Sequence, residues 1–410
     1  MKKQAKLFGF IAFILILFFG FEIYQRMNSD DQMEVEVITD AGDQTHLNEV
    51  AFIGSAYNQN SSGNSTTFYY KGADISYYND LSFFKRLDFE YNPKANHLVT
   101  NYRSFMRGKS RQNNLFTETD KHIIYTATEA DIDWRNFNSN VLNISVLDKE
   151  TENEESFEVK LINDINQSHY INVVATYVNY PELTIITSEN VSDYYSNRLF
   201  VYTVNVEEPE ETADAIINLS EEVGSNDSFL NISTSILKTE RYIPLQVVQE
   251  TYGEYGEVEQ SSVEYYLYDR ENNEVLDVPA FDENPMVIFA EEDKVYIGED
   301  FANTIELYEL DVVSQSLDSI GSLNMSTPII GRTNDYYYNN QFNNTLYIAD
   351  GKLYAYEDDY SQETSRPLFQ IIDIDSLDTL FTGTVEVKDT SEGSFYDVYV
   401  NDLMISTSEN

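Results

Sequence analysis

Four histidines are the only imidazole groups of this chain, and their spacing does not indicate a catalytic or metal site. His46, His97, His122 and His169 lie far apart, and none forms a metal-binding pair or adjoins a serine-nucleophile motif. His122 alternates with strand-type residues, which indicates an ordinary surface or strand histidine. The chain has no cysteine, so thiol nucleophiles, thiolate zinc sites, disulfides and lipid attachment through cysteine are excluded.

Carboxylates are abundant, and two at the right separation suffice for glycoside hydrolysis. With 71 Asp and Glu residues, pairs arise in any arrangement and carry no signal without geometry. The segment Thr39 to His46 is similar to the Ser-x-Asp-x-Gly-x-Thr-Trp turn of propeller sialidases, but its Thr45 stands one place late and His46 replaces the Trp. Trp134 is the single tryptophan, which also weakens a sugar-stacking enzyme. The sequence therefore predicts no catalytic residue and no enzyme activity.

Calcium is the metal that best suits an acidic β-rich protein, because it takes carboxylate and carbonyl oxygens from turns. The densest acidic motif contains Asp373, Asp375 and Asp378. It lacks the glycine and the terminal glutamate of a calcium-binding loop, so we interpret it as a solvated turn. No metal site and no cofactor is predicted.

Adjacent tyrosines recur along the chain and are candidates for a binding face. They are Tyr69-Tyr70, Tyr77-Tyr78, Tyr194-Tyr195, Tyr265-Tyr266 and Tyr336-Tyr337-Tyr338. Neighbouring residues of a strand point to opposite faces of its sheet. We therefore expect the two rings of a pair to pack on opposite sides of one sheet, which needs no ligand.

The elements that carry these residues are predicted to be strands. Apolar alternation over five to eight residues is broken by Asn, Asp, Gly and Ser, and the only helical pattern, over residues 210–223, is weak. Five strands end at an Asp or Asn that precedes a short turn and another apolar run, namely Asp148, Asn205, Asp269, Asp311 and Asp373. We predict hairpins in which these side chains accept hydrogen bonds from the backbone amides of the turn.

The strands preceding these hairpins also align, and Tyr296, Tyr347 and Tyr399 follow one another at intervals of 51 and 52 residues. A period of this size with four strands per repeat is typical of a β-propeller. We expect an all-β fold of about seven blades, within a range of six to eight. Two consecutive β-sandwiches are the alternative, with boundaries at residues 207–211 or 282–285.

The segment from Val146 to Thr151 resembles the strand and turn of quinoprotein-like, WD-repeat-like and other extracytoplasmic propeller repeats, whose turn reads Asp, two variable residues, Thr, Gly. Here Glu152 replaces the Gly and the repeat's closing Trp is missing. The resemblance supports the fold and does not extend to a quinone cofactor or to any named activity.

The last repeat begins near the end of the chain, at residues 396–406. Its two strand segments lack partners, and an open sheet edge is unfavourable. We expect Met33 to Ile38 or Glu49 to Ile53 to complete that blade.

The N-terminus predicts an uncleaved membrane anchor. Lys2, Lys3 and Lys6 precede an apolar run from Leu7 to Phe21. We assign residues 1–6 to the cytoplasm, 7–24 to the transmembrane segment, 25–44 to a linker and closing strand, and 45–410 to a propeller ectodomain outside the cell membrane. A cleaved signal peptide is the alternative, but residues 21–27 offer no small residues for a cleavage site.

The formal net charge of −46 makes nucleic acid an implausible partner. The acidity fits either a salty exterior or a general bias of exported proteins. The sequence favours a binding, scaffold or sensor-input protein of the cell envelope, whose partner is another protein, a peptide or a cell-wall polymer. The alternative function is an exported, carboxylate-dependent hydrolase of glycosidase type.

Overall fold

The computed structural model describes most of the chain from residue 33 onward. The described residues are Phe13, Gly20 and the ranges 33–59, 65–72, 74–82, 85–86, 89–132, 140–162, 168–191, 197–224, 229–232, 241–252, 258–279, 286–291, 293–301, 304–324, 344–359, 366–388 and 396–405. Most of the predicted anchor, residues 7–24, lies outside them, as do Trp134 and two of the tyrosine groups. Among the helices that are described, none has the length and apolarity needed to cross a membrane.

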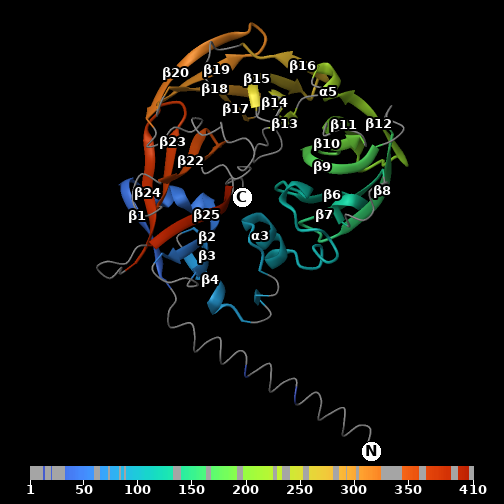
Figure 1. The fold of residues 1–410 in the computed structure, drawn as a ribbon. Coiled ribbons are helices and arrows are strands. Elements are labelled where there is room, and N and C mark those ends of the chain that lie inside the picture. The colour runs from blue at the N-terminus through green and yellow to red at the C-terminus, as the bar shows by residue number, and fades with distance from the viewer. Residues whose placement is uncertain are drawn as a thin grey trace, which may run out of the picture. The chain divides into compact units, whose positions relative to one another are not determined.

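The chain divides into two compact units, and Figure 1 shows the elements of each. The first unit comprises residues 1–101, 355–371 and 379–406, and the second comprises 102–354, 372–378 and 407–410. Almost all regular structure is strand, which agrees with the predicted all-β class.

The first unit is built from the two ends of the chain. Its elements are β1 (Val35–Gly42), η2 (Gln44–Glu49), β2 (Val50–Asn58), β3 (Ser65–Lys71), β4 (Asp74–Tyr77), η3 (Tyr78–Asp80), α3 (Pro93–Asn101), β24 (Thr379–Val387), β25 (Tyr396–Ile405) and most of β22 (Lys352–Asp359) and β23 (Arg366–Asp373). One four-stranded sheet has the order β25-β2-β3-β4. The predicted pairing of the last strand with the N-terminal region is therefore confirmed.

Both N-terminal candidates for that pairing form strands, but only β2 completes the sheet of β25. The pairs run from Val50–Ile405 to Asn58–Tyr396. The other candidate, β1, pairs antiparallel with β24 at the edge of a sheet ordered β1-β24-β23-β22-β21. Phe52 lies in the core of this unit. Its ring stacks on Tyr70 and on Phe369, at 4.7 and 5.0 Å between ring centroids.

The second unit begins with an eight-stranded sheet ordered β5-β6-β7-β8-β12-β11-β10-β9. Its elements are η4 (Asn113–Leu115), β5 (Phe116–Glu118), β6 (His122–Thr128), α4 (Glu129–Ile132), β7 (Val141–Asp148), β8 (Glu154–Ile162), β9 (Ser168–Asn179), β10 (Glu182–Val191), β11 (Asn197–Asn205), β12 (Thr212–Asn218) and α5 (Leu219–Glu222). It consists of two antiparallel groups of four, joined by a parallel pairing of their last strands at Thr212–Lys160 and Ala213–Leu161. The sequence pattern did not predict this junction.

Two further sheets of this unit have the orders β13-β14-β15-β16 and β17-β18-β19-β20. Their strands are β13 (Phe229–Ile232), β14 (Tyr242–Tyr252), β15 (Val258–Asp269), β16 (Glu274–Asp277), β17 (Met286–Glu291), β18 (Lys294–Phe301), β19 (Thr304–Asp311) and β20 (Ser316–Asn324), and β21 (Asn344–Ala349) follows them. Within the described residues, the sheets of both units contain six groups of four strands, and the expected count of seven is not confirmed.

Consecutive sheets of the second unit pack face to face through the two sides of β14 and β15. Ile243 and Leu245 contribute to a core shared with β9, β10 and β11, whereas Tyr242 and Leu267 contribute to a core shared with β17 and β18. Small four-stranded sheets stacked in this way form a propeller-like arrangement.

The predicted Asx-capped hairpins are confirmed at all five positions. Asp148 accepts from Thr151 N at 2.7 Å, Asn205 from Glu207 N at 2.9 Å, Asp269 from Glu271 N at 2.9 Å, Asp311 from Val313 N at 2.9 Å and Asp373 from Ser376 N at 2.9 Å. In four of these turns the fourth residue after the Asp has a left-handed backbone, with φ of 57° at Glu152, 54° at Asn273, 55° at Gln315 and 58° at Leu377. This position corresponds to the Gly of the Asp-x-x-Thr-Gly turn that residues 146–151 resemble.

One predicted detail is wrong. Tyr347 lies in β21, the first strand of its group of four, whereas Tyr296 lies in the second strand of its own. The equivalent of Tyr296 is Tyr354, since Lys352-Leu353-Tyr354 begins β22 as Lys294-Val295-Tyr296 begins β18. The region 210–223, whose helical pattern was weak, contains strand β12 and the short helix α5, and β12 pairs with β11 as the hairpin predicted after Asn205. The nine-residue helix α3 was not predicted.

Candidate functional site

The histidines occupy separate elements. His46 lies in η2, His97 in α3, His122 in β6 and His169 in β9. His97 Nδ1 lies 2.9 Å from the side-chain Nδ2 of Asn101, one turn along the same helix. Within the described ranges, no group of three or more His, Asp or Glu side chains is placed to hold a metal ion.

His122 has the most structured surroundings of the four. Its ring stacks on Tyr180 at 4.1 Å between centroids, and its Nε2 lies 4.0 Å from Asp148 Oδ2. Burial lowers the pKa of His122, although the Asp148 carboxylate opposes this effect. The ring is therefore a neutral packing group near pH 7.

The acidic motif at residues 373–378 is a hairpin turn. Asp373 Oδ1 accepts hydrogen bonds from the amide and the hydroxyl of Ser376, both at 2.9 Å. These bonds hold the pKa of Asp373 below its ordinary value. One carboxylate of the motif is thus occupied by its own turn, as the sequence predicts.

The segment similar to a sialidase turn is the end of β1 and the start of η2. Asp43 caps η2 by accepting from Thr45 N at 2.9 Å, and its own amide donates to Leu380 O at 2.9 Å. Gly42 adopts φ of 80° and abuts the Leu380 carbonyl, so a side chain does not fit there. These residues hold the end of β1 against β24.

The tyrosine pair at 265 and 266 shows the expected division between faces. Tyr265 packs against the core shared with β17 and β18, and Tyr266 packs against the core shared with β9 to β11. In the pair at 69 and 70, Tyr70 is 1% exposed and Tyr69 is half-buried. Packing between sheets accounts for these rings.

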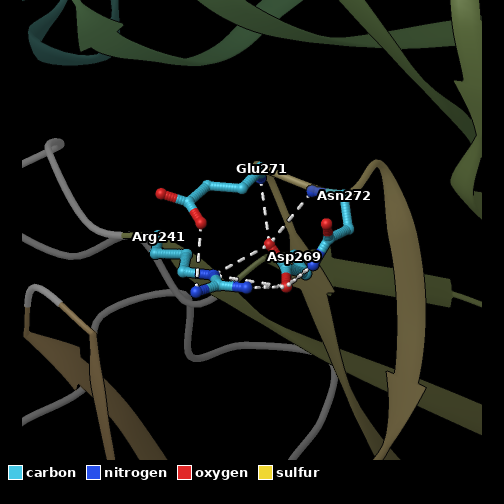
Figure 2. A network of polar contacts seen from close by, with 4 residues as sticks. All are labelled: Arg241, Asp269, Glu271 and Asn272. Carbon is cyan, nitrogen blue, oxygen red and sulfur yellow. Dashed lines mark hydrogen bonds and ion pairs between the residues drawn. The ribbon is translucent and has the colours of Figure 1, made fainter.

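A polar network clamps the β15–β16 turn, and Figure 2 shows its four residues. Arg241 immediately precedes β14. Its guanidinium donates from Nη2 to Asp269 Oδ2 at 2.7 Å and from Nε to Asp269 Oδ1 at 3.1 Å. Its Nη1 lies 3.0 Å from Glu271 Oε2. Asp269 also accepts from Asn272 Nδ2 at 2.9 Å. These contacts together hold the turn between β15 and β16 in place.

Electrostatics reinforce this clamp. Burial alone would raise the pKa of Asp269, which is 2% exposed, but the hydrogen bonds from Arg241, Asn272 and Glu271 outweigh burial and hold that pKa below its ordinary value. The hydrogen bond to Asp269 raises the pKa of Arg241. The sequence indicated the Asp269 turn, but no motif linked it to Arg241.

Buried polar groups also join the two ends of the eight-stranded sheet. Thr117 Oγ1 donates to Thr176 O at 2.8 Å and Thr128 Oγ1 donates to Ile171 O at 2.6 Å. The amide of Val173 donates to Asp131 Oδ2 at 3.1 Å. Side chains from the β5–β6 end thus satisfy backbone groups of edge strand β9. We call Thr117, Thr128, Asp131 and their partners in β9 the seam.

Among the described residues, the carboxyl group whose pKa is raised is that of Asp131, in the seam. Burial raises the pKa of Asp131, and three hydrogen bonds, from Thr128 N, Thr128 Oγ1 and Val173 N, oppose that effect. Another acid, Glu189, accepts from Tyr202 OH at 2.9 Å and is fully buried on β10. No sequence motif marks either acid.

Comparisons with known proteins find no matching family model and no matching curated protein. Solved structures do match. An uncharacterized protein from Listeria monocytogenes is 9% identical, with a TM-score of 0.36, and the match covers 67% of each chain. An oligogalacturonate lyase in complex with manganese is 8% identical, with a TM-score of 0.40 and 85% of each chain covered. A prolyl endopeptidase is 8% identical, with a TM-score of 0.36, and the match covers 88% of this chain and 51% of that one.

Two of these three similar structures are named as enzymes. At these identities and TM-scores, the matches assign no activity to this chain, which spans about half the length of the endopeptidase.

Proposed function

We propose that this chain is an envelope protein that binds a partner through surfaces displayed by rigid, turn-clamped sheets. The observation that carries the proposal is the use of Asp or Asn side chains to fix five equivalent hairpins, from Asp148 to Asp373. Turns held in this way are preorganised, and preorganised surfaces bind with a smaller entropic cost. Binding also needs no set of catalytic residues. The partner is a protein, a peptide or a cell-wall polymer.

The finer architecture belongs to the same proposal. Six groups of four strands and the pairing of β25 with β2 support a closed propeller of six to eight blades. The left-handed backbone of Glu152 supports the resemblance to quinoprotein-like repeats, because the Gly that those repeats carry at this position adopts such a backbone without strain.

The location of the ectodomain rests on the N-terminal sequence. Three lysines before the apolar run from Leu7 to Phe21 support an anchor with its N-terminus in the cytoplasm. Protease added to intact protoplasts should then remove a C-terminal tag, and the mature protein should retain residues 7–24 in mass spectrometry. A mature N-terminus between residues 27 and 41 would contradict the anchor.

A carboxylate-dependent hydrolase is the second candidate function. The observation that favours it is the pKa of Asp131, which burial raises as a general acid requires. Against it, Asp131 already accepts hydrogen bonds from Thr128 and Val173.

One experiment separates the two functions. The full-length protein in neutral detergent is incubated with purified cell-wall polymer and with envelope peptides, and the ligand is then recovered and sized. Retention of ligand of unchanged length is the expected result. Ligand that is shortened by the wild-type protein but not by Asp131→Asn would establish the hydrolase and overturn the binding proposal.

A further inference from the structure

One loop of the second unit is positively charged, opposite in sign to the net charge of the molecule. Residues 102–117 contain Arg103, Arg107, Lys109 and Arg111 and no Asp or Glu, in a chain with 25 basic and 71 acidic side chains. We call residues 102–111 the basic loop. An anionic partner is repelled by most of the surface, so the basic loop is where such a partner is attracted.

The basic loop is built onto the sheet by its lysine. Lys109 Nζ donates to Phe105 O at 2.7 Å, contacts Glu154 Oε1 at 2.6 Å and lies 4.0 Å from the centroid of the Phe105 ring. The following amide, of Ser110, donates to the Tyr125 hydroxyl at 3.2 Å on β6. The side chain of Lys109 is 11% exposed. Lys109 therefore holds the loop against the sheet.

The remaining basic residues of the loop are exposed. Arg103, Arg107 and Arg111 recur every four residues and are all exposed, and the turn between them is supported by the bond from Met106 N to Tyr102 O at 3.0 Å. Three guanidinium groups in series on a fixed loop suit a ligand that carries repeated negative charges. Guanidinium forks match oxyanions with two parallel hydrogen bonds.

We propose that the basic loop binds a linear polymer that carries phosphate groups along its backbone. The inference rests on the proposed binding function and names its ligand class. Carboxylate groups also pair with basic side chains, as Glu154 does with Lys109 at 2.6 Å, so a ligand of this loop has to compete with the chain's own carboxylates. A phosphate group offers more acceptor oxygens and competes better for arginine.

The test measures binding of linear inorganic polyphosphate to full-length protein in neutral detergent between 50 and 200 mM salt. Three charge contacts predict an affinity that falls about 20-fold over this range, because log K declines with a slope of about −0.7 per contact. The combined variant Arg103→Gln, Arg107→Gln and Arg111→Gln should lose this binding and its salt dependence. The matched control is Lys71→Gln, Lys121→Gln and Lys160→Gln, which removes three exposed charges elsewhere and should bind as the wild type does.

Several results would overturn the proposal. Equal affinity of the arginine variant and the control would show that the loop is not the site. Poly-glutamate binding as tightly as polyphosphate would remove the phosphate assignment, and binding to phosphatidylglycerol vesicles without polyphosphate binding would indicate a lipid surface instead. If the arginine variant still retains the cell-wall polymer that the wild type retains, the proposed binding function stands and this inference fails. If the wild type retains no envelope ligand, the proposed function itself fails.

Discussion

At the scale of single residues, the acids of this chain serve its turns. The Asp and Asn residues at strand ends were predictable, because a side chain that caps two backbone amides is a local device and needs no tertiary information. Their partners across the sheet were not predictable. Arg241 precedes Asp269 by a whole hairpin, and only the β14–β15 register brings the two together.

Asp269→Asn tests the clamp. We expect a loss of roughly 2 to 3 kcal/mol in unfolding free energy at pH 7, since the Arg241 guanidinium would lose the nearer and more buried of its two charged partners and keep only the exposed Glu271. Because the folded pKa of Asp269 is depressed, its contribution is present above the ordinary Asp pKa and is lost as pH falls through the folded value. Urea unfolding measured between pH 7 and pH 2 checks this. Asp311→Asn, in an exposed turn without an arginine, is the control and should cost less.

The left-handed turn positions give a second prediction at this scale. Glu152→Gly and Gln315→Gly should each stabilise the fold by roughly 0.5 to 1 kcal/mol, because non-glycine residues are strained at positive φ. Thermal unfolding measures the effect.

Asn273→Gly is the matched control for these substitutions. Asn tolerates this backbone, and its Oδ1 accepts from Tyr268 OH at 2.8 Å, so the change should bring no gain. Stabilisation by Asn273→Gly equal to that by Glu152→Gly would show that backbone strain is not the cause.

At the scale of elements, the strands and hairpins were predictable and their assembly into sheets was predictable only in part. Alternation and turn residues are local signals, so β7, β15 and β23 end where the sequence indicates. The parallel junction of β8 with β12 and the seam at β9 depend on contacts between distant segments. Thr117 and Thr176 show why: their hydrogen bond joins residues 59 positions apart, and threonine is common in any strand.

Asp131 provides the prediction for the seam. Because its folded pKa is raised, the native state binds a proton more readily than the unfolded chain, and stability is lost as pH rises through the folded pKa. Asp131→Asn should abolish that part of the pH dependence while keeping an acceptor for the Val173 amide. Denaturant unfolding across pH 4 to 8 measures it.

Asp131→Ala is the companion variant. It leaves the Val173 amide without its acceptor and should be less stable than the Asn variant by roughly 1 to 3 kcal/mol. Parallel pH profiles for the wild type and the Asn variant would refute a buried, titrating Asp131.

At the scale of the whole molecule, charge is the dominant property. With a net charge of −46, like-charge neighbours outnumber opposite ones, and self-repulsion weakens the folded state at low ionic strength. Screening shortens the Debye length from ~30 Å at 0.01 M to ~3 Å at 1 M salt, so sodium chloride should raise Tm across this range. Calcium at matched ionic strength is the control: stabilisation far beyond that of sodium chloride would reveal a specific carboxylate site and contradict the assignment of Asp373 to a turn.

The pairing of the two chain ends in one sheet makes the first unit a single cooperative body from segments more than 300 residues apart. Tyr57 and Asp397 are direct partners in β2 and β25. The natural chain has no cysteine, so an engineered pair reports on this register alone.

The decisive measurement is disulfide formation in the variant Tyr57→Cys/Asp397→Cys after mild oxidation, scored by mass spectrometry of the linked peptides. Paired antiparallel residues lie about 4.5 to 5.5 Å apart, within reach of a disulfide. The control variant Tyr57→Cys/Leu403→Cys places the second cysteine about 20 Å further along the strand. We expect a near-complete cross-link in the first variant and none in the control. Absence of the 57–397 link, or equal linkage in the control, would contradict the pairing of β2 with β25.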